Sequence, residues 1–334
     1  MKEKIRYPDI PKGLKDKDLT QFLALKDNWE FSCSMLENLN KQLNEKIDNE
    51  HISIVVAGSF GRLDAYKESD LDYMILTERD DGDVKKIIDE LSKIASSLNI
   101  KLPNPTGVFS EIIPIDHIIN KTGARDDDLY SLAQRMLLLM ESKPIYNESV
   151  FRNAVDKILR KYLELIMIDP KKEALFLLND VIRYFRSICV NYQFNFWKEE
   201  DKWVMRNVKL RHSRIIMYAG LLLLILNASK NTEDKFSYMQ SKIYLTPIEK
   251  IIHVYTDNKD LSFTRILGTY DVFLRKISDG EIRKALRVDY DERYSNPYYA
   301  ELKVNSDNLQ TEFTRFIFAQ KGRWTEQIYE YLIF

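Results

Sequence analysis

Two carboxylates at strand spacing are the residues of this chain best suited to chemistry. Asp70 and Asp72 stand immediately before an apolar run that ends at Leu76. Residues two apart on a strand point to the same face, so the two aspartates are expected to project together while Leu71 turns into the core. Carboxylate oxygens are the ligands that Mg²⁺ prefers. The spacing therefore predicts a site for a hard divalent cation.

A glycine turn comes shortly before these aspartates. The apolar run Ile52–Ala57 is typical of a buried strand, and Gly58 and Ser59 end it. Gly58 lets the backbone turn sharply and approach a ligand closely, and Ser59 offers a hydroxyl and a backbone N–H. A helix starting there would present N–H groups to an anion. Phosphoryl-type transfer needs positioning and charge neutralisation by metals, so the combination predicts a site for that chemistry.

A third carboxylate on a neighbouring strand would complete a two-metal site and help to deprotonate an attacking hydroxyl. The segment Val108–Ile119, VFSEIIPIDHII, has the alternation of a strand and carries Glu111 and Asp116. These acids are five residues apart, so on a regular strand they face opposite sides and only one can join the aspartates. The residues themselves leave both candidates open.

The elements that must position these residues form a small sheet. The order strand, turn, strand, helix over residues 83–98 and strand predicts a mixed sheet with helices against it, preceded by a helix that ends near Ile47. Strand signals almost vanish further along the chain. The predicted fold class is α+β, with a sheet module over residues 1–124 and a larger all-helical domain over residues 125–334.

Composition places the chain among ordinary globular proteins. It has 334 residues, 45% of them hydrophobic, and a net charge of −1, so no global field attracts nucleic acid. Cys33 and Cys189 are expected to be reduced thiols, and no signal peptide is recognised, which predicts a cytoplasmic protein. The apolar run Ile215–Leu226 is too short for a membrane span of about 20 residues and is predicted to be a buried helix without membrane insertion. The oligomeric state is left open.

The motif residues resemble the DNA polymerase β-like nucleotidyltransferase superfamily. Its signature is Gly-Ser, a short helix, Asp-x-Asp on a strand and a third acid on a later strand, and Gly58-Ser59 and Asp70/Asp72 match the Gly-Ser and Asp-x-Asp parts here. In signalling members the third acid often stands in an acid-hydrophobic-hydrophobic-Pro sequence, which Glu111 begins and which ends at Pro114. The resemblance therefore favours Glu111, with Glu where Asp is usual. It implies a nucleotidyltransferase core with an N-terminal helix, and a helical domain that closes the nucleotide cleft.

The resemblance also implies a reaction. A nucleoside monophosphate would pass from an NTP or dNTP, such as ATP or dATP, to a hydroxyl acceptor with release of pyrophosphate. Asp70, Asp72 and Glu111 would hold two Mg²⁺ ions, for which Mn²⁺ could substitute. Gly58 and Ser59 would hold the terminal phosphates.

Basic residues further along the chain are the predicted partners of the nucleotide. Arginine and lysine suit phosphate, and those on two expected helices could hold a triphosphate or form a solvated edge. The candidates for nucleotide binding are Arg62, Arg183, Arg186, Arg206 and Lys209.

Weaker similarity extends downstream. The segments QRMLLLMESKPIYN, LLNDVIRYFRSICVNYQ, RNVKLRHSR and the terminal YLIF look like bacterial stand-alone nucleotidyltransferases that include enzymes of the Hailong anti-phage system. That likeness implies a short DNA or nucleotide signal in antiviral defence, a single-stranded nucleic acid product and an effector protein as partner. A C-terminal tyrosine is the primer there, and Tyr331 and Tyr329 match it. The alternatives are nucleotidylation of a protein or tRNA, and a catalytically silent nucleotide-binding scaffold.

Overall fold

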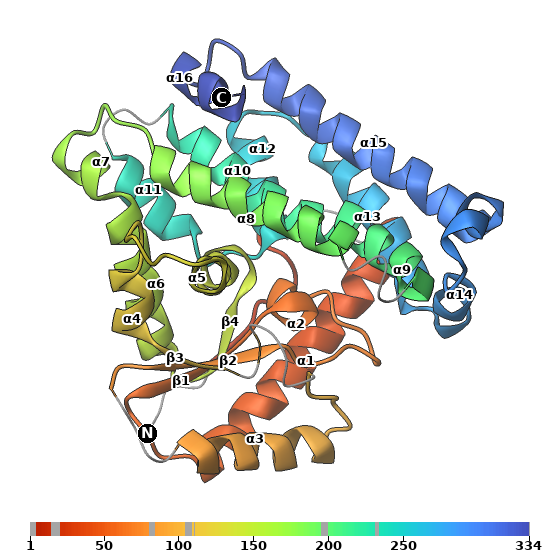
Figure 1. Cartoon of the computed structure of the whole chain (residues 1–334), viewed down its shortest axis with the longest axis horizontal. Coiled ribbons are helices and arrows are strands. Elements are labelled where there is room, and N and C mark those ends of the chain that lie inside the picture. Colours follow the sequence, from red (N-terminus) through yellow and green to blue (C-terminus); the bar gives the residue numbers. More distant parts are fainter. Residues whose placement is uncertain are drawn as a thin grey trace. The chain divides into compact units, whose positions relative to one another are not determined.

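The chain folds into two compact units that differ in secondary structure (Figure 1). The computed structural model describes residues 5–14, 21–79, 84–103, 109, 111–194, 200–230 and 234–333. Unit 1 comprises Met1–Pro11 and Asn28–Ile168, and unit 2 comprises Lys12–Asp27 and Asp169–Phe334.

Unit 1 contains a four-stranded mixed sheet in the order β3-β2-β1-β4. Its strands are β1 (Ile52–Val56), β2 (Tyr73–Thr77), β3 (Glu111–Pro114) and β4 (Lys143–Tyr146). The central strand β1 is antiparallel to β2 and β4, whereas β2 and β3 are parallel. The predicted α+β class and mixed sheet are confirmed.

Helices cover the sheet on both faces. The α-helices described in unit 1 are α1 (Leu23–Lys46), α2 (Gly58–Arg62), α3 (Val84–Ser97), α4 (Ile115–Asn120), α5 (Leu129–Glu141), α6 (Glu148–Tyr162) and α7 (Glu164–Ile168). Leu36 of α1 and Leu91 of α3 share one apolar core with Ile54 and Ile75 of the sheet. The helix α6 packs against β1 and β2. The strands β1 and β2 are buried at every residue because both of their faces are covered, as their continuous apolar runs predict.

Two elements differ from the sequence expectation. The strand expected over Val108–Ile119 ends at Pro114, and α4 follows it. Proline has no N–H for a strand ladder, and its fixed φ allows it to precede the first turn of a helix. The part of this expected strand at residues 104–108 and 110 lies outside the described residues. The strand β4 was not predicted because Pro144 suggests only a helix break, yet β4 is an edge strand, where proline is tolerated.

The compact units also place the boundary between the two modules differently from the predicted division after residue 124. Unit 1 extends to Ile168 because β4 pairs with β1 and because α6 packs on the sheet. The segment Lys12–Asp27 belongs to unit 2, where the N–H of Leu25 donates to Oδ1 of Asp271 at 2.9 Å.

Unit 2 is helical over most of its described residues. Its α-helices are α8 (Leu175–Phe194), α9 (Trp203–Lys209), α10 (Ile215–Ala228), α11 (Lys235–Lys242), α12 (Pro247–Asp257), α13 (Phe263–Ser278), α14 (Gly280–Ala285), α15 (Pro297–Ala319) and α16 (Glu326–Ile333). The short helices are the 3₁₀ turns η3 (Glu200–Lys202) and η5 (Tyr290–Ser295) and the π-helical turn η4 (Leu210–Arg214), which joins α9 to α10.

The helix α10 forms the centre of the unit 2 core, as its apolar run predicts. Leu221, Leu223 and Leu224 are fully buried, and α10 packs closely on α12. A Cβ at Gly220 would lie 2.8 Å from Cα of Pro247, so only glycine permits this approach. Within the described ranges, no helix combines the length and the apolar character needed to cross a membrane.

Candidate functional site

The glycine turn lies directly against one of the two aspartates. Gly58 has φ +61°, and a Cβ built on it would fall 2.4 Å from Oδ2 of Asp72. The N–H of Ala57 donates to the backbone carbonyl of Asp72 at 2.8 Å, which fixes the two segments side by side. The positive φ favours glycine at this position, and a side chain there would have to displace the carboxylate of Asp72. The turn and the carboxylate therefore form one local arrangement.

The two aspartates flank a core residue, as their spacing predicts. Leu71 is fully buried in the apolar core, whereas Asp70 is exposed and Asp72 is half-buried. The N–H of Leu71 donates to the carbonyl of Lys101 at 2.7 Å, and Asp70 forms an isolated parallel bridge with Lys101. Since β2 begins only at Tyr73, the aspartates lie in the extended segment that leads into the strand.

The backbone distinguishes the two candidates for the third carboxylate. The register of β2 and β3 aligns Glu111 with Met74, two residues after Asp72, so the position of Glu111 falls on the sheet face to which Asp72 leads. The side chain of Glu111 lies outside the described part of the structure.

Asp116 has a different environment. It stands in the first turn of α4 with a 74% exposed side chain, and Nζ of Lys157 lies 3.6 Å from its Oδ1. Among the described residues, no three His, Cys, Asp or Glu side chains gather as a metal site. Of the two candidates, the backbone geometry favours Glu111.

Arg62 anchors the helix that follows the glycine turn. Its guanidinium is buried and donates to both carboxylate oxygens of Asp64, at 2.8 and 3.1 Å, and to Oε2 of Glu141 at 2.6 Å. A Cβ at Gly61 would collide with the carbonyl oxygen of Glu141 and lie 2.9 Å from that of Val56. These contacts hold α2 against the end of α5. Nucleotide contact by Arg62 stays a prediction; the described contacts give this residue a structural role that the sequence did not indicate.

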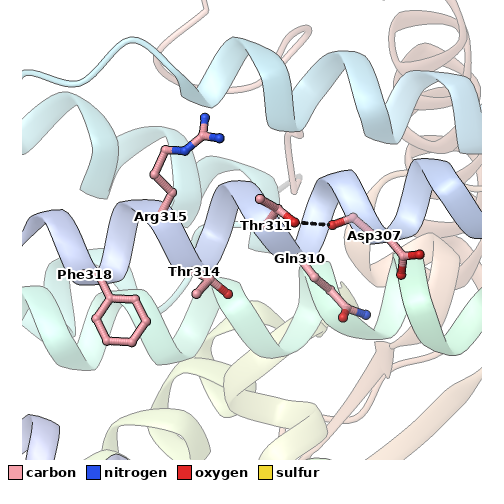
Figure 2. A pocket seen from close by; sticks show the side chains of 6 residues that line it. All are labelled: Asp307, Gln310, Thr311, Thr314, Arg315 and Phe318. Atoms are coloured by element: carbon pink, nitrogen blue, oxygen red, sulfur yellow. Dashed lines mark hydrogen bonds between the residues drawn. The ribbon is translucent and has the colours of Figure 1, made fainter.

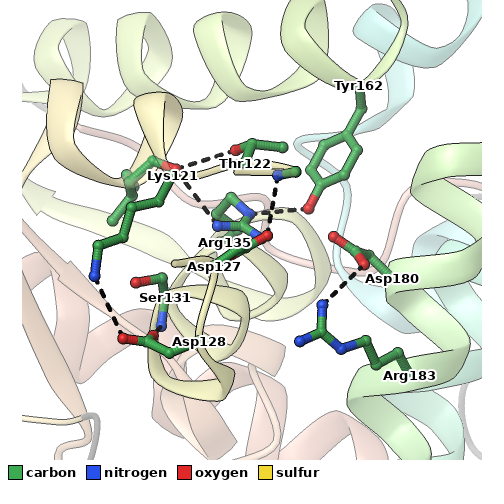
Figure 3. A network of polar contacts seen from close by, with 11 residues as sticks. Lys121, Thr122, Asp127, Asp128, Ser131, Arg135, Tyr162, Asp180 and Arg183 are labelled. Carbon is green, nitrogen blue, oxygen red and sulfur yellow. Dashed lines mark hydrogen bonds and ion pairs between the residues drawn. The ribbon is translucent and has the colours of Figure 1, made fainter. Parts of the chain in front are cut away.

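A buried arginine fixes α5 in turn (Figure 3). Arg135 is fully buried and donates to Asp127 at 2.7 and 2.9 Å and to the hydroxyl of Tyr162 at 2.9 Å. Asp128 caps α5 by accepting from the N–H of Ser131 at 2.7 Å, and this hydrogen bond lowers the pKa of Asp128 to about 2. Side-chain contacts therefore fix both ends of α5, the helix against which α2 is held.

The remaining predicted nucleotide partners belong to unit 2. Arg183 is exposed, and its Nη1 lies 3.7 Å from Oδ1 of Asp180 (Figure 3). Arg186 lines a cavity that is described below. On α9, Arg206 is half-buried and Lys209 is exposed. Contact of these residues with a nucleotide stays a prediction.

The two candidate tyrosines near the C-terminus have different environments. The hydroxyl of Tyr329 donates to the carbonyl of Ile317 at 2.9 Å, and burial raises its pKa. Tyr331 is 46% exposed. The helix α16 that carries both is docked through Ile328, which is fully buried.

Comparison with known proteins adds no relative: no protein-family model matches the chain, and no curated protein matches it. The resemblance to polymerase β-like nucleotidyltransferases therefore rests on the motif residues themselves.

Proposed function

We propose that this protein is a Mg²⁺-dependent nucleotidyltransferase that moves a nucleoside monophosphate from an NTP or dNTP onto a hydroxyl. The observation that carries the proposal is the close approach of Gly58 to Asp72, which seats a carboxylate against a turn whose positive φ favours glycine. Asp70, exposed one residue beyond the buried Leu71, supplies a second carboxylate beside it. An all-oxygen donor pair of this kind suits Mg²⁺, or Mn²⁺ in its place.

Each acidic residue has a role in this proposal. Asp70 and Asp72 would hold the metal ions, whose chemistry is to neutralise charge on the phosphates. Glu111 would complete the ligand set and accept the proton of the acceptor hydroxyl. The acceptor oxygen forms a bond to the α-phosphorus while the bond from this phosphorus to the bridging oxygen breaks, and pyrophosphate leaves. Ser59, half-buried at the start of α2, would donate a hydrogen bond from its hydroxyl to the terminal phosphates.

The product and acceptor are inferred from the resemblance. We infer a short DNA or nucleotide signal that acts in defence against phage, with the first nucleotide attached to a C-terminal tyrosine. The environments of the two candidates favour Tyr331, because its side chain is exposed, whereas the hydroxyl of Tyr329 already donates to a backbone carbonyl. A hydroxyl engaged in that way must lose its hydrogen bond before it can attack a phosphate.

One experiment tests the reaction class. The full chain is incubated with each α-phosphate-labelled NTP and dNTP and Mg²⁺, and the products are separated by size. We expect a labelled product with at least one nucleotide, and none from the Asp70→Asn/Asp72→Asn variant. Label on an added protein or tRNA would favour the nucleotidylation alternative. Absence of transfer with every nucleotide and acceptor would refute the proposed activity and favour a silent scaffold.

A second experiment tests the primer. Intact-mass measurement after incubation should show added nucleotide on the wild type and on Tyr329→Phe, but not on Tyr331→Phe. Equal labelling of Tyr331→Phe would show that this tyrosine is not the acceptor.

A further inference from the structure

A cavity of about 500 Å³ lies within unit 2, between α8, the π-helical turn η4, α10 and α15. This volume is in the range of pockets that hold small molecules. Much of its wall is apolar and comes from three of these elements: Leu210, Ile215, Leu222 and Phe313. The cavity therefore offers an apolar ligand a largely apolar surface to pack against.

An aromatic pair forms another part of the wall. The rings of Phe185 on α8 and Tyr218 on α10 stack with their centroids 4.3 Å apart. Burial raises the pKa of the Tyr218 hydroxyl to about 12, so this group stays neutral and can donate a hydrogen bond. The pair combines a flat apolar surface with a polar group.

Among the described residues of the lining, the charged side chains are Arg186 and Arg211, and none is a carboxylate. Nε of Arg211 donates to Oγ of Ser306 at 2.8 Å, and its Nη2 pairs with Asp307. Arg186 is exposed, and its charge opposes the effect of burial on the pKa of both Tyr218 and Cys189.

The wall from α15 adds uncharged polar groups. Figure 2 shows Gln310, Thr314 and Phe318 on one side of α15 and Arg315 on the other. Gln310 and Thr314 line both the cavity and the shallow hollow drawn in that figure.

The π-helical turn is fixed by His212, whose Nδ1 lies 2.8 Å from the carbonyl of Val208 and whose Nε2 lies 3.1 Å from Nδ2 of Asn305. Such turns in long helices often occur at functional sites.

We propose that this cavity binds a small amphipathic anion. The apolar body of the anion would lie against the apolar wall that includes Leu210 and Phe313, and its carboxylate would lie at Arg186. A nucleoside triphosphate fits less well, because several negative charges would face only two guanidiniums and a polar sugar would face an apolar wall. The site goes beyond the proposed nucleotide transfer: it uses none of the acidic residues assigned to that reaction, and it gives Arg186, a nucleotide partner predicted from the sequence, a different anion.

Cys189 allows a direct test, because it lines the cavity and is half-buried, whereas Cys33, the other cysteine of the chain, is buried in unit 1. The full chain is treated with iodoacetamide at increasing decanoate, and modification of each cysteine is followed by peptide mass. We expect decanoate to slow modification of Cys189 about tenfold without slowing that of Cys33. Decanol, which lacks the charge, should protect Cys189 only at higher concentration.

Two arginine variants separate the charge at the cavity from charge elsewhere on α8. Arg186→Gln should need about fivefold more decanoate for half-protection, as expected for loss of an exposed ion pair, and should distinguish decanoate from decanol less than the wild type does. Arg183→Gln, which removes a guanidinium of the same helix outside the lining, should behave like the wild type. Protection is compared with the unprotected rate of each variant, because Arg186 also lowers the pKa of the thiol.

Three results would overturn the proposal. One is a Cys189 rate that does not change with decanoate. Another is equal weakening by Arg183→Gln and Arg186→Gln. The third is protection of Cys189 by dATP and Mg²⁺ but not by decanoate, which would make the cavity a nucleotide site.

Discussion

Replacing Gly58 by alanine should displace Asp72 and damage catalysis far more than folding. The new Cβ would lie 2.4 Å from Oδ2 of Asp72 and 3.3 Å from its Cγ, whereas ordinary van der Waals contact needs about 3.5 Å. The carboxylate must therefore move by about 1 Å, and a shift of that size can cost about 100-fold in rate. The positive φ of +61° adds a backbone cost of about 1–2 kcal/mol to folding.

Gly123→Ala is the matched control for this substitution. Gly123 also belongs to unit 1 and has φ +71°, but a Cβ there would meet no atom within 4 Å. Both variants should lose similar stability in urea unfolding, and only Gly58→Ala should lose nucleotide transfer at saturating Mg²⁺. Wild-type transfer by Gly58→Ala, or an equal loss in Gly123→Ala, would refute the reasoning that connects the turn to Asp72.

Three further predictions concern stability and the third carboxylate. Arg62→Met should destabilise unit 1 by about 3–5 kcal/mol in urea unfolding, because two buried carboxylates lose their cation; a loss below about 1 kcal/mol would contradict this. Burial lowers the pKa of His212 in the folded chain to about 4. As the pH falls below about 6.5, the imidazole of His212 is therefore protonated in the unfolded chain before it is protonated in the folded chain. Stability should therefore fall towards pH 4 by up to about 1.4 kcal/mol per pH unit, and His212→Gln should remove that part of the slope; an unchanged slope would exclude His212 as its source. Glu111→Gln should abolish nucleotide transfer while Asp116→Asn retains it, and the reverse result would reassign the third carboxylate.

The central part of the fold was predictable because its signals are local. The runs at Ile52–Val56 and Tyr73–Thr77 are apolar at nearly every position, and the structure buries both strands on both faces. Leu71 is in the core, as the alternation with Asp70 and Asp72 predicts. The apolar density of α10 likewise indicated a buried helix. In each case a few neighbouring residues carry the information.

The elements that were not predicted depend on distant partners. The strand β4 is short and contains Pro144, and it becomes a strand only through pairing with β1. The same pairing keeps β4 in the compact unit that extends to Ile168. The structural role of Arg62 needs Glu141, which is far away in the sequence, and the spacing of Gly58 and Gly61 was the one local signal of a tightly packed turn.

Transfer of labelled α-phosphate in the presence of Mg²⁺ is the most direct test of the proposed chemistry. The wild type is compared with Asp70→Asn/Asp72→Asn and with Asp116→Asn, which alters an exposed carboxylate in the first turn of α4. We predict transferred label with an equimolar yield of pyrophosphate for the wild type and Asp116→Asn, and neither product for the double variant. Equal label and pyrophosphate from the double variant would contradict the assignment of the reaction to Asp70 and Asp72.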